Sequence, residues 1–167
     1  TDMTNVKFEN WWQPFTNNRA FVDNPRMFSR AEGCFLYTDD DRSVLDITAG
    51  LWCCNIGHAR KSVADAVHAQ LMLIDFAPPF QFGTEPAFDF ATRLMKHTPE
   101  GINRIFFTNS GSEAVDTALK IAHLYQQSRG KGSKTRFISR EQGYHGVNIG
   151  GTSMQGLPNN RHGFPVL

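Results

Sequence analysis

A short run of small polar residues in this sequence has the chemistry to bind a phosphate group. Ser110, Gly111 and Ser112 follow the apolar residues 105–107 and stand at the start of a helical pattern. Ser110 and Glu113 have the spacing of a capping box, which marks a helix start. The first N–H groups of a helix are unpaired and carry about half a positive charge, and a glycine lets a ligand approach the backbone. The pattern predicts either a phosphate site or an ordinary capped helix without a ligand.

A second loop adds a flat aromatic side chain. Tyr144 lies in the glycine-flanked run Gly143-Tyr144-His145-Gly146, directly after another β-prone segment. In a doubly wound sheet, ligands bind beyond the carboxyl ends of the parallel strands, where this loop and the turn 110–112 would both lie. An aromatic ring beside a phosphate site suits a cofactor that has both a ring and a phosphate, because the rings can stack. A tyrosine in such a loop can also be a simple anchor, and the nearby phosphate turn favours a site.

A strand–helix–strand unit is needed to position these two loops. Residues 104–108 and 136–139 are β-prone, and the helical pattern that begins near Ser112 lies between them. This order predicts a βαβ unit, and therefore a parallel sheet with helices packed on its faces. Two strands are too few to bury both faces of such a sheet, so these residues are not expected to form an autonomous domain.

The upstream half predicts a hairpin and two helices. The runs 34–37 and 44–47, joined by three consecutive aspartates, indicate a β-hairpin. Apolar residues at helical spacing predict a helix over 63–74, and Thr84-Glu85-Pro86 predicts a helix that reaches about Lys96. Residues 1–33, rich in asparagine, proline and aromatic residues, are interpreted as an irregular lead-in segment.

Composition excludes several classes of function. The formal net charge of 167 residues is +1, which gives no electrostatic case for nucleic acid. No apolar run reaches the roughly 20 residues of a membrane span. The aspartates 39–41 lack the spacing of a calcium loop, and the three cysteines include no spaced pair for zinc, so no metal site is predicted. No signal peptide opens the sequence, and a reduced, cytoplasmic protein is expected.

The order of these motifs resembles the class III aminotransferases, which are pyridoxal-phosphate enzymes of fold type I. The matching residues run from Thr108 to Glu113, from Asp116 to Lys120 and from Gly143 to Gly146. Similar residues continue upstream through Asn55-Ile56-Gly57-His58, Gly50-Leu51-Trp52 and Pro14-Phe15-Thr16, so the resemblance covers nearly the whole chain. Within the family, Val147-Asn148-Ile149 and the Gly-Leu-Trp triplet look most like the ω-amino acid–pyruvate (β-alanine–pyruvate) branch.

The resemblance implies an α/β fold and a division of the chain. Residues 1–58 would be an N-terminal segment with a β-hairpin, belonging to the small domain. Residues 59–167 would begin the large cofactor-binding domain, whose sheet is mostly parallel. Family dimers also imply a homodimer or homotetramer in which Phe80 lies near the subunit interface.

The resemblance also implies individual roles. Gly111 and Ser112 would donate hydrogen bonds to pyridoxal 5'-phosphate, with Ser110 shaping the turn, and Tyr144 would stack on the pyridine ring. Trp52 and Phe15 would line an apolar wall over the cofactor and limit the substrates that reach it. Core packing is the other interpretation of Trp52, Phe15 and Phe80.

The implied reaction moves an amino group from an ω-amino acid or amine to pyruvate. The alternatives are another class III aminotransferase acting on 4-aminobutyrate, ornithine or a diamine, and a non-catalytic phosphate-binding module. A dinucleotide site is disfavoured because no Gly-x-Gly-x-x-Gly follows a predicted strand.

The family's catalytic residues have no counterpart in this sequence. In the family, the Schiff-base lysine, the acid that pairs with the pyridinium and the carboxylate-binding arginine all follow the Tyr-His-Gly loop. The six lysines of this chain stand outside that context. We therefore expect an N-terminal part of a transaminase that has no catalytic residue of its own and is inactive alone.

Overall fold

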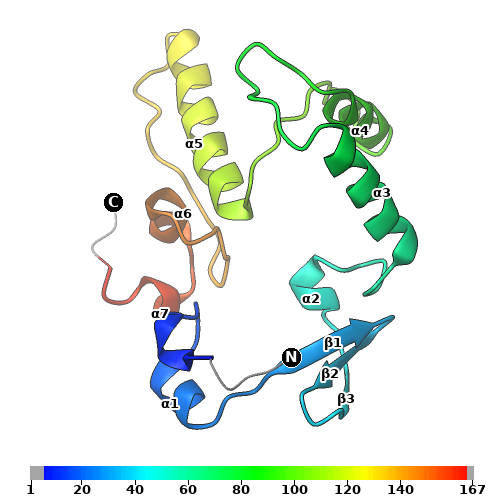
Figure 1. Cartoon of the computed structure of the whole chain (residues 1–167). Helices are drawn as coiled ribbons and strands as arrows, with labels where there is room; N and C mark the ends of the chain where they lie inside the picture. The colour runs from blue at the N-terminus through cyan, green and yellow to red at the C-terminus, as the bar shows by residue number, and fades with distance from the viewer. Residues whose placement is uncertain (1–5, 165–167) are drawn as a thin grey trace. The chain divides into compact units, whose positions relative to one another are not determined.

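The computed structural model describes residues 6–164, which form two compact units. The first unit ends at Gly83 and the second begins at Thr84. Figure 1 labels the elements of both. The sequence-based boundary between residues 58 and 59 concerns the domains of a longer protein and stays a prediction.

The first unit contains a small antiparallel sheet and short helices. The 3-10 helix η1 (Phe8–Asn10) and helix α1 (Asn18–Asp23) precede strands β1 (Phe28–Glu32), β2 (Phe35–Thr38) and β3 (Ser43–Leu45). The strands pair antiparallel in the order β1-β2-β3. Helices α2 (Ala49–Trp52) and α3 (Lys61–Leu73) follow, so the predicted hairpin and the helix predicted over 63–74 are confirmed.

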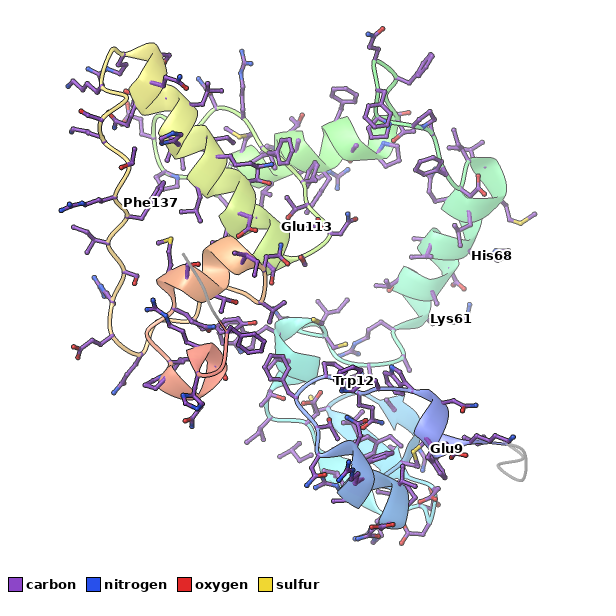
Figure 2. All side chains as sticks on the ribbon, turned by 90° about the vertical axis from the view of Figure 1, so that its left-hand side faces the viewer. Glu9, Trp12, Lys61, His68, Glu113 and Phe137 are labelled. Carbon is purple, nitrogen blue, oxygen red and sulfur yellow. The ribbon has the colours of Figure 1, made fainter. Side chains whose placement is uncertain are left out.

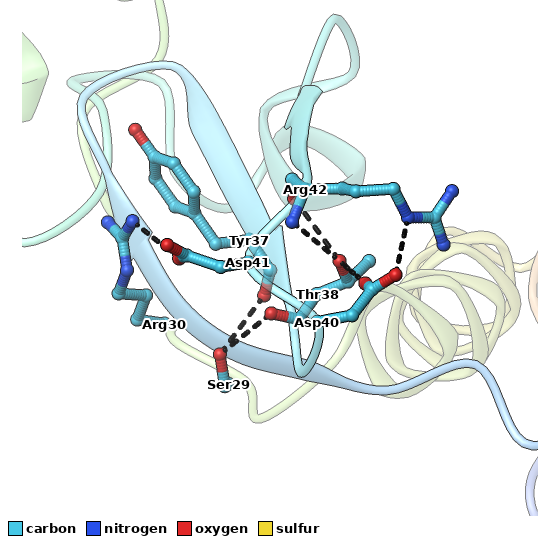
Figure 3. Close-up of polar contacts among 7 residues, drawn as sticks. All are labelled: Ser29, Arg30, Tyr37, Thr38, Asp40, Asp41 and Arg42. Carbon is cyan, nitrogen blue, oxygen red and sulfur yellow. Dashed lines mark hydrogen bonds and ion pairs between the residues drawn. The ribbon is translucent and has the colours of Figure 1, made fainter.

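Side chains on the hairpin turn tie it to β1 (Figure 3). Arg30 on β1 donates to Asp41 at 2.9 Å, and its guanidinium lies 3.4 Å from the centre of the Tyr37 ring. Ser29 donates to the carbonyl of Thr38 at 3.0 Å. The interpretation of residues 1–33 as irregular is therefore wrong for η1, α1 and β1, and residues 1–5 lie outside the described residues. The sequence of β1 lacks an apolar alternation, and its pairing with β2 determines its conformation.

The second unit is helical apart from its connecting segments. It contains α4 (Glu85–Met95), α5 (Gly111–Ser128), α6 (Ile149–Met154) and α7 (Pro158–Arg161). The helix predicted after Thr84 is confirmed as α4, with Pro86 in its first turn. Helix α6 packs on α5, and α7 packs on α6.

The two strands predicted on either side of α5 are not strands in this structure. Residues 104–108 and 136–139 lack secondary structure, and neither segment has a ladder partner within residues 6–164. Figure 2 labels Phe137 on the second segment and Glu113 at the start of α5. A strand needs the N–H and C=O groups of a neighbouring strand, and the described residues provide none here. The prediction that these two apolar segments form paired strands is therefore wrong for the described residues.

The described residues do not close a hydrophobic core. None of their hydrophobic side chains is fully buried, and the accessible surface of the chain is 14705 Å². A compact monomer of this mass exposes ~8300 Å². A cavity of about 780 Å³ lies between α5, α6 and residues 135–137. These elements therefore depend on packing that residues 6–164 do not supply.

Candidate functional site

The start of α5 has the capped geometry that the sequence predicted. Ser110 is the N-cap, with φ −153° and ψ 160°, and its Oγ accepts from the N–H of Glu113 at 3.1 Å. The Glu113 carboxylate accepts from the N–H of Asn109 at 2.9 Å. Both bonds hold the chain in a sharp turn from residues 104–108 into the helix.

Two N–H groups at this turn remain available to a ligand. Within residues 6–164, the N–H groups of Gly111 and Ser112 have no recorded hydrogen-bond acceptor. They belong to the first turn of an 18-residue helix, where the helix itself offers no acceptor. Apart from its chain neighbours and the backbone of α5, no atom lies within 4 Å of the Cβ position of Gly111, so the described residues leave room for a ligand beside it. The turn can therefore bind an anion.

The loop that carries Tyr144 packs directly on this turn. The N–H of Val147 donates to Ser112 Oγ at 3.0 Å. Gly146 has φ +99°, and a Cβ there would lie 2.8 Å from Ser112 Cα. Only glycine adopts this φ without strain and permits such a close approach. The structure thus brings together the two motifs that the sequence placed 30 residues apart.

A second contact holds the start of α6, a few residues further along the chain, to α5. The N–H of Gly151 on α6 donates to Asp116 Oδ1 at 3.0 Å. A Cβ on Gly150 would lie 2.7 Å from the same carboxylate oxygen. The chain that follows Tyr144 is therefore held to α5 at two points, residues 146–147 and residues 150–151.

The side chains of Ser112 and Tyr144 keep free bonding capacity. Ser112 Oγ uses one lone pair for Val147, and its O–H remains a donor. The Tyr144 side chain is exposed, at 54%, so its ring is accessible. His145 Nε2 is buried and has no hydrogen-bond partner in the part of the chain described.

Trp52 and Phe15 lie in the first unit, on unusual backbone. Residues 49–52 all have positive φ, from +50° at Ala49 to +70° at Trp52, although only one of them is glycine. The Trp52 side chain is exposed, at 83%, and Phe15 and Phe80 are exposed as well. Their contribution to a cofactor or substrate site stays a prediction.

A buried carboxylate holds this left-handed turn. Asp46 Oδ1 accepts from the N–H and Oγ1 of Thr48 at 3.2 and 3.1 Å. Asp46 Oδ2 accepts from the N–H of Gly50 at 2.7 Å and lies 2.8 Å from His58 Nε2. The hydrogen bond from His58 lowers the pKa of Asp46 below its usual value. The bonds from Gly50 and Thr48 lower it further, whereas burial opposes the shift.

Sequence analysis did not identify Asp46 as important. The Asp-x-Thr spacing of residues 46–48 is a signal for a local turn in which the carboxylate accepts from the backbone. The partner His58 stands 12 residues later and gives no such local signal.

A comparison with known protein families identifies the chain. The model described as "Aminotransferase class-III" matches residues 17–165. The chain belongs to the class-III aminotransferase family.

Relatives of this class-III aminotransferase chain include two proteins that are named as aminotransferases. It is 55% identical to an omega-aminotransferase of Caulobacter vibrioides over 157 residues, which are 94% of this chain and 36% of that protein. It is 44% identical to the omega-amino acid–pyruvate aminotransferase of Pseudomonas putida, over 93% of this chain and 35% of that protein. The chain spans about a third of the length of the curated relatives it matches.

The class-III fold is also seen in solved structures. An omega transaminase from Pseudomonas jessenii, crystallised in complex with PMP, superposes with a TM-score of 0.91 at 33% sequence identity. The superposition covers 96% of this chain and 36% of that one. The chain therefore has part of the α/β, fold type I architecture of these transaminases, and the fold implied by the resemblance is confirmed.

The class-III chain has neither a membrane-spanning helix nor a metal cluster among its described residues. No helix within residues 6–164 is long and apolar enough to span a membrane. In the same residues, no three His, Cys, Asp or Glu side chains gather in a way that could hold a metal ion.

Proposed function

We propose that this chain is the N-terminal part of a pyridoxal-phosphate-dependent aminotransferase that moves an amino group from an ω-amino acid or amine to pyruvate. The observation that carries the proposal is the packing of the Tyr144 loop on the α5 turn, through the bond from Val147 to Ser112. The names of both relatives support the transfer of an amino group, and the name of the Pseudomonas putida relative supports the choice of pyruvate.

The residues present fit the phosphate of the cofactor. Two N–H groups without acceptors within residues 6–164, at Gly111 and Ser112, meet open space at the positive end of α5. The Ser112 O–H can add a third donor. An anion with several oxygens satisfies these donors, whereas an apolar group would leave them unpaired.

The residues present also fit the ring. Tyr144 lies on a loop fixed to the same turn and has an accessible ring, so it can stack on a flat heterocycle whose phosphate the turn holds. Ser110 shapes the turn through its cap bond to Glu113.

Each of these residues binds or orients and none reacts. Pyridoxal phosphate, when bound, supplies the electron-withdrawing ring that makes transfer of an amino group possible. Gly111 and Ser112 fix the phosphate, and Tyr144 fixes the plane of the ring. Trp52 and Phe15 provide apolar surface that excludes water and limits the size of the donor. The lysine and the acid that complete the chemistry belong to the longer protein.

The substrates are an amino donor and pyruvate, and the enzyme is a homodimer or homotetramer with the exposed Phe80 near the subunit interface. A cytoplasmic location accords with the sequence, whose cysteines include no spaced pair for a disulfide framework.

The test uses the full-length protein, saturated with pyridoxal phosphate, and measures alanine formed from pyruvate. We expect β-alanine or a simple amine to support alanine formation. Faster reaction with 4-aminobutyrate, ornithine or a diamine would assign another class III activity. No alanine from any of these donors, with the cofactor bound, would contradict the proposal and favour a non-catalytic role.

A further inference from the structure

The left-handed turn at residues 49–52 is a costly conformation. Left-handed backbone is sterically disfavoured for every residue other than glycine, because the Cβ atom approaches the following carbonyl oxygen. Ala49, Leu51 and Trp52 all adopt it here, with φ of +50°, +59° and +70°. Several consecutive residues in this region persist only where the surroundings determine them, and such strain concentrates at ligand-binding sites.

Hydrogen bonds to Asp46 hold the turn at residues 49–52 in its left-handed conformation. Its two carboxylate oxygens accept four hydrogen bonds, three of them from the turn residues Thr48 and Gly50 and one from His58. The Gly50 N–H stands one residue before the strained Leu51. The Asp46 side chain is only 5% exposed, and its contact with His58 is part-buried.

His58 holds the same carboxylate oxygen that accepts from the turn residue Gly50. Its Nε2 lies 2.8 Å from Asp46 Oδ2, and its side chain is 14% exposed. Its backbone is in turn held by paired bonds with Gly33, of 2.7 and 3.2 Å. The backbone N–H of Asp46 donates to Cys34 at 2.8 Å. The sheet and the turn are therefore joined through one carboxylate.

We propose that Asp46 is a positioning residue for Trp52 and thereby sets the size of the amine that the enzyme accepts. The turn it clamps ends at Trp52, so the hydrogen bonds that Asp46 accepts from Thr48 and Gly50 determine the direction in which the backbone presents this indole. The inference rests on the proposed function, because it assumes that Trp52 lines the substrate site.

The experiment compares donors of two sizes on the full-length enzyme. We measure kcat and KM for β-alanine and for the bulky 1-phenylethylamine, with pyruvate as acceptor, in Asp46→Asn. The substitution replaces one carboxylate oxygen by an N–H group that faces other donors, so the turn loosens. We expect kcat/KM for the bulky donor to rise relative to the small one by roughly tenfold, the discrimination that a methylene gives in an apolar pocket.

Asp41→Asn is the matched control. It makes the same chemical change in the same unit and removes the charge of the exposed ion pair with Arg30. Within residues 6–164, no hydrogen bond or ion pair joins Asp41 or Arg30 to residues 49–52. The control's ratio of donor specificities should equal that of the unmodified enzyme. A second variant, His58→Gln, leaves the bonds from Thr48 and Gly50 to Asp46 in place. It should raise kcat/KM for the bulky donor relative to the small one, as Asp46→Asn does, but by a smaller factor.

Each outcome decides one question. An unmodified enzyme that makes no alanine would defeat the proposed function. An active enzyme in which Asp46→Asn lowers kcat/KM for both donors equally, or changes neither, would show that Asp46 is only structural. If Asp46→Asn fails to fold, His58→Gln decides alone, and an unchanged ratio in that variant overturns the proposal.

Discussion

Two turns with predicted roles in ligand binding are stabilised in opposite ways. The α5 turn is relaxed: Ser110 has extended backbone, and its cap bonds come from residues next to it in sequence. The turn at 49–52 has four consecutive residues with positive φ and depends on Asp46 and on His58.

The difference follows from what each turn presents. The α5 turn offers backbone N–H groups, which any well-capped helix start exposes, so no strain is needed. The turn at 49–52 presents a large side chain, and aiming it requires a backbone that local preferences disfavour. Backbone donors are thus obtained from local structure, whereas the placement of the indole depends on a tertiary clamp.

The largest effect should follow from removing the surrounding polypeptide. Both turns rest on elements with no fully buried hydrophobic side chain among the residues described. Expressed alone, the 167-residue chain should therefore show no cooperative thermal transition by circular dichroism and no binding of pyridoxal phosphate. A sharp transition from the monomeric fragment would show that both turns are self-supporting.

Gly146→Ala should separate the Tyr144 loop from the α5 turn. The added Cβ would lie 2.8 Å from Ser112 Cα, and overpacking of this kind costs about 1–3 kcal/mol. We expect the affinity of the full-length protein for pyridoxal phosphate, measured by absorbance titration, to fall by about tenfold or more.

Gly130→Ala is its control. Gly130 also has positive φ, +68°, but no atom lies within 4 Å of its Cβ position. This variant should lose stability from backbone strain and keep its cofactor affinity. Equal losses of affinity in the two variants would mean that the contact with Ser112 is irrelevant to the site.

Tyr144→Ala should weaken cofactor retention with the fold intact. Stacked aromatic pairs contribute about 0.5–1.5 kcal/mol beyond burial, which corresponds to about a twofold to tenfold loss of affinity. Tyr144→Phe keeps the ring and should bind the cofactor as the unmodified protein does. Unchanged affinity in Tyr144→Ala would make the tyrosine a loop anchor.

The smallest effect tests the strain at the second turn. Ala49 has φ +50°, so Ala49→Gly removes about 1 kcal/mol of left-handed strain and should raise or preserve the melting temperature of the full-length protein. Ala66→Gly, within α3, should lower it, because glycine destabilises a helix interior by about 0.5–1 kcal/mol. A comparable decrease in both variants would indicate that the turn is not strained.

The contrast also explains how far sequence analysis succeeded. The cap at Ser110 and Glu113, helices α3 and α4 and the β2–β3 hairpin depend on neighbours in sequence, and all were predicted. Strand β1 and the clamp at Asp46 depend on partners distant in sequence, and both were missed. The strands predicted at 104–108 and 136–139 were wrong because apolar composition indicates burial, whereas a strand also needs a partner.

The packing of the Tyr144 loop on the α5 turn was expected only in outline. The sequence-based prediction of a shared sheet edge placed both motifs near one another, but the bond from Val147 to Ser112 and the need for glycine at 146 are visible only in the tertiary structure. Spacing alone contains no information on such contacts.

The most direct test of the account is a crystal structure of the full-length protein with pyridoxal phosphate bound. The account predicts phosphate oxygens within hydrogen-bonding distance of the N–H groups of Gly111 and Ser112, with the Tyr144 ring stacked on the pyridine. A phosphate held elsewhere, with those two N–H groups bonded to other parts of the protein, would contradict it.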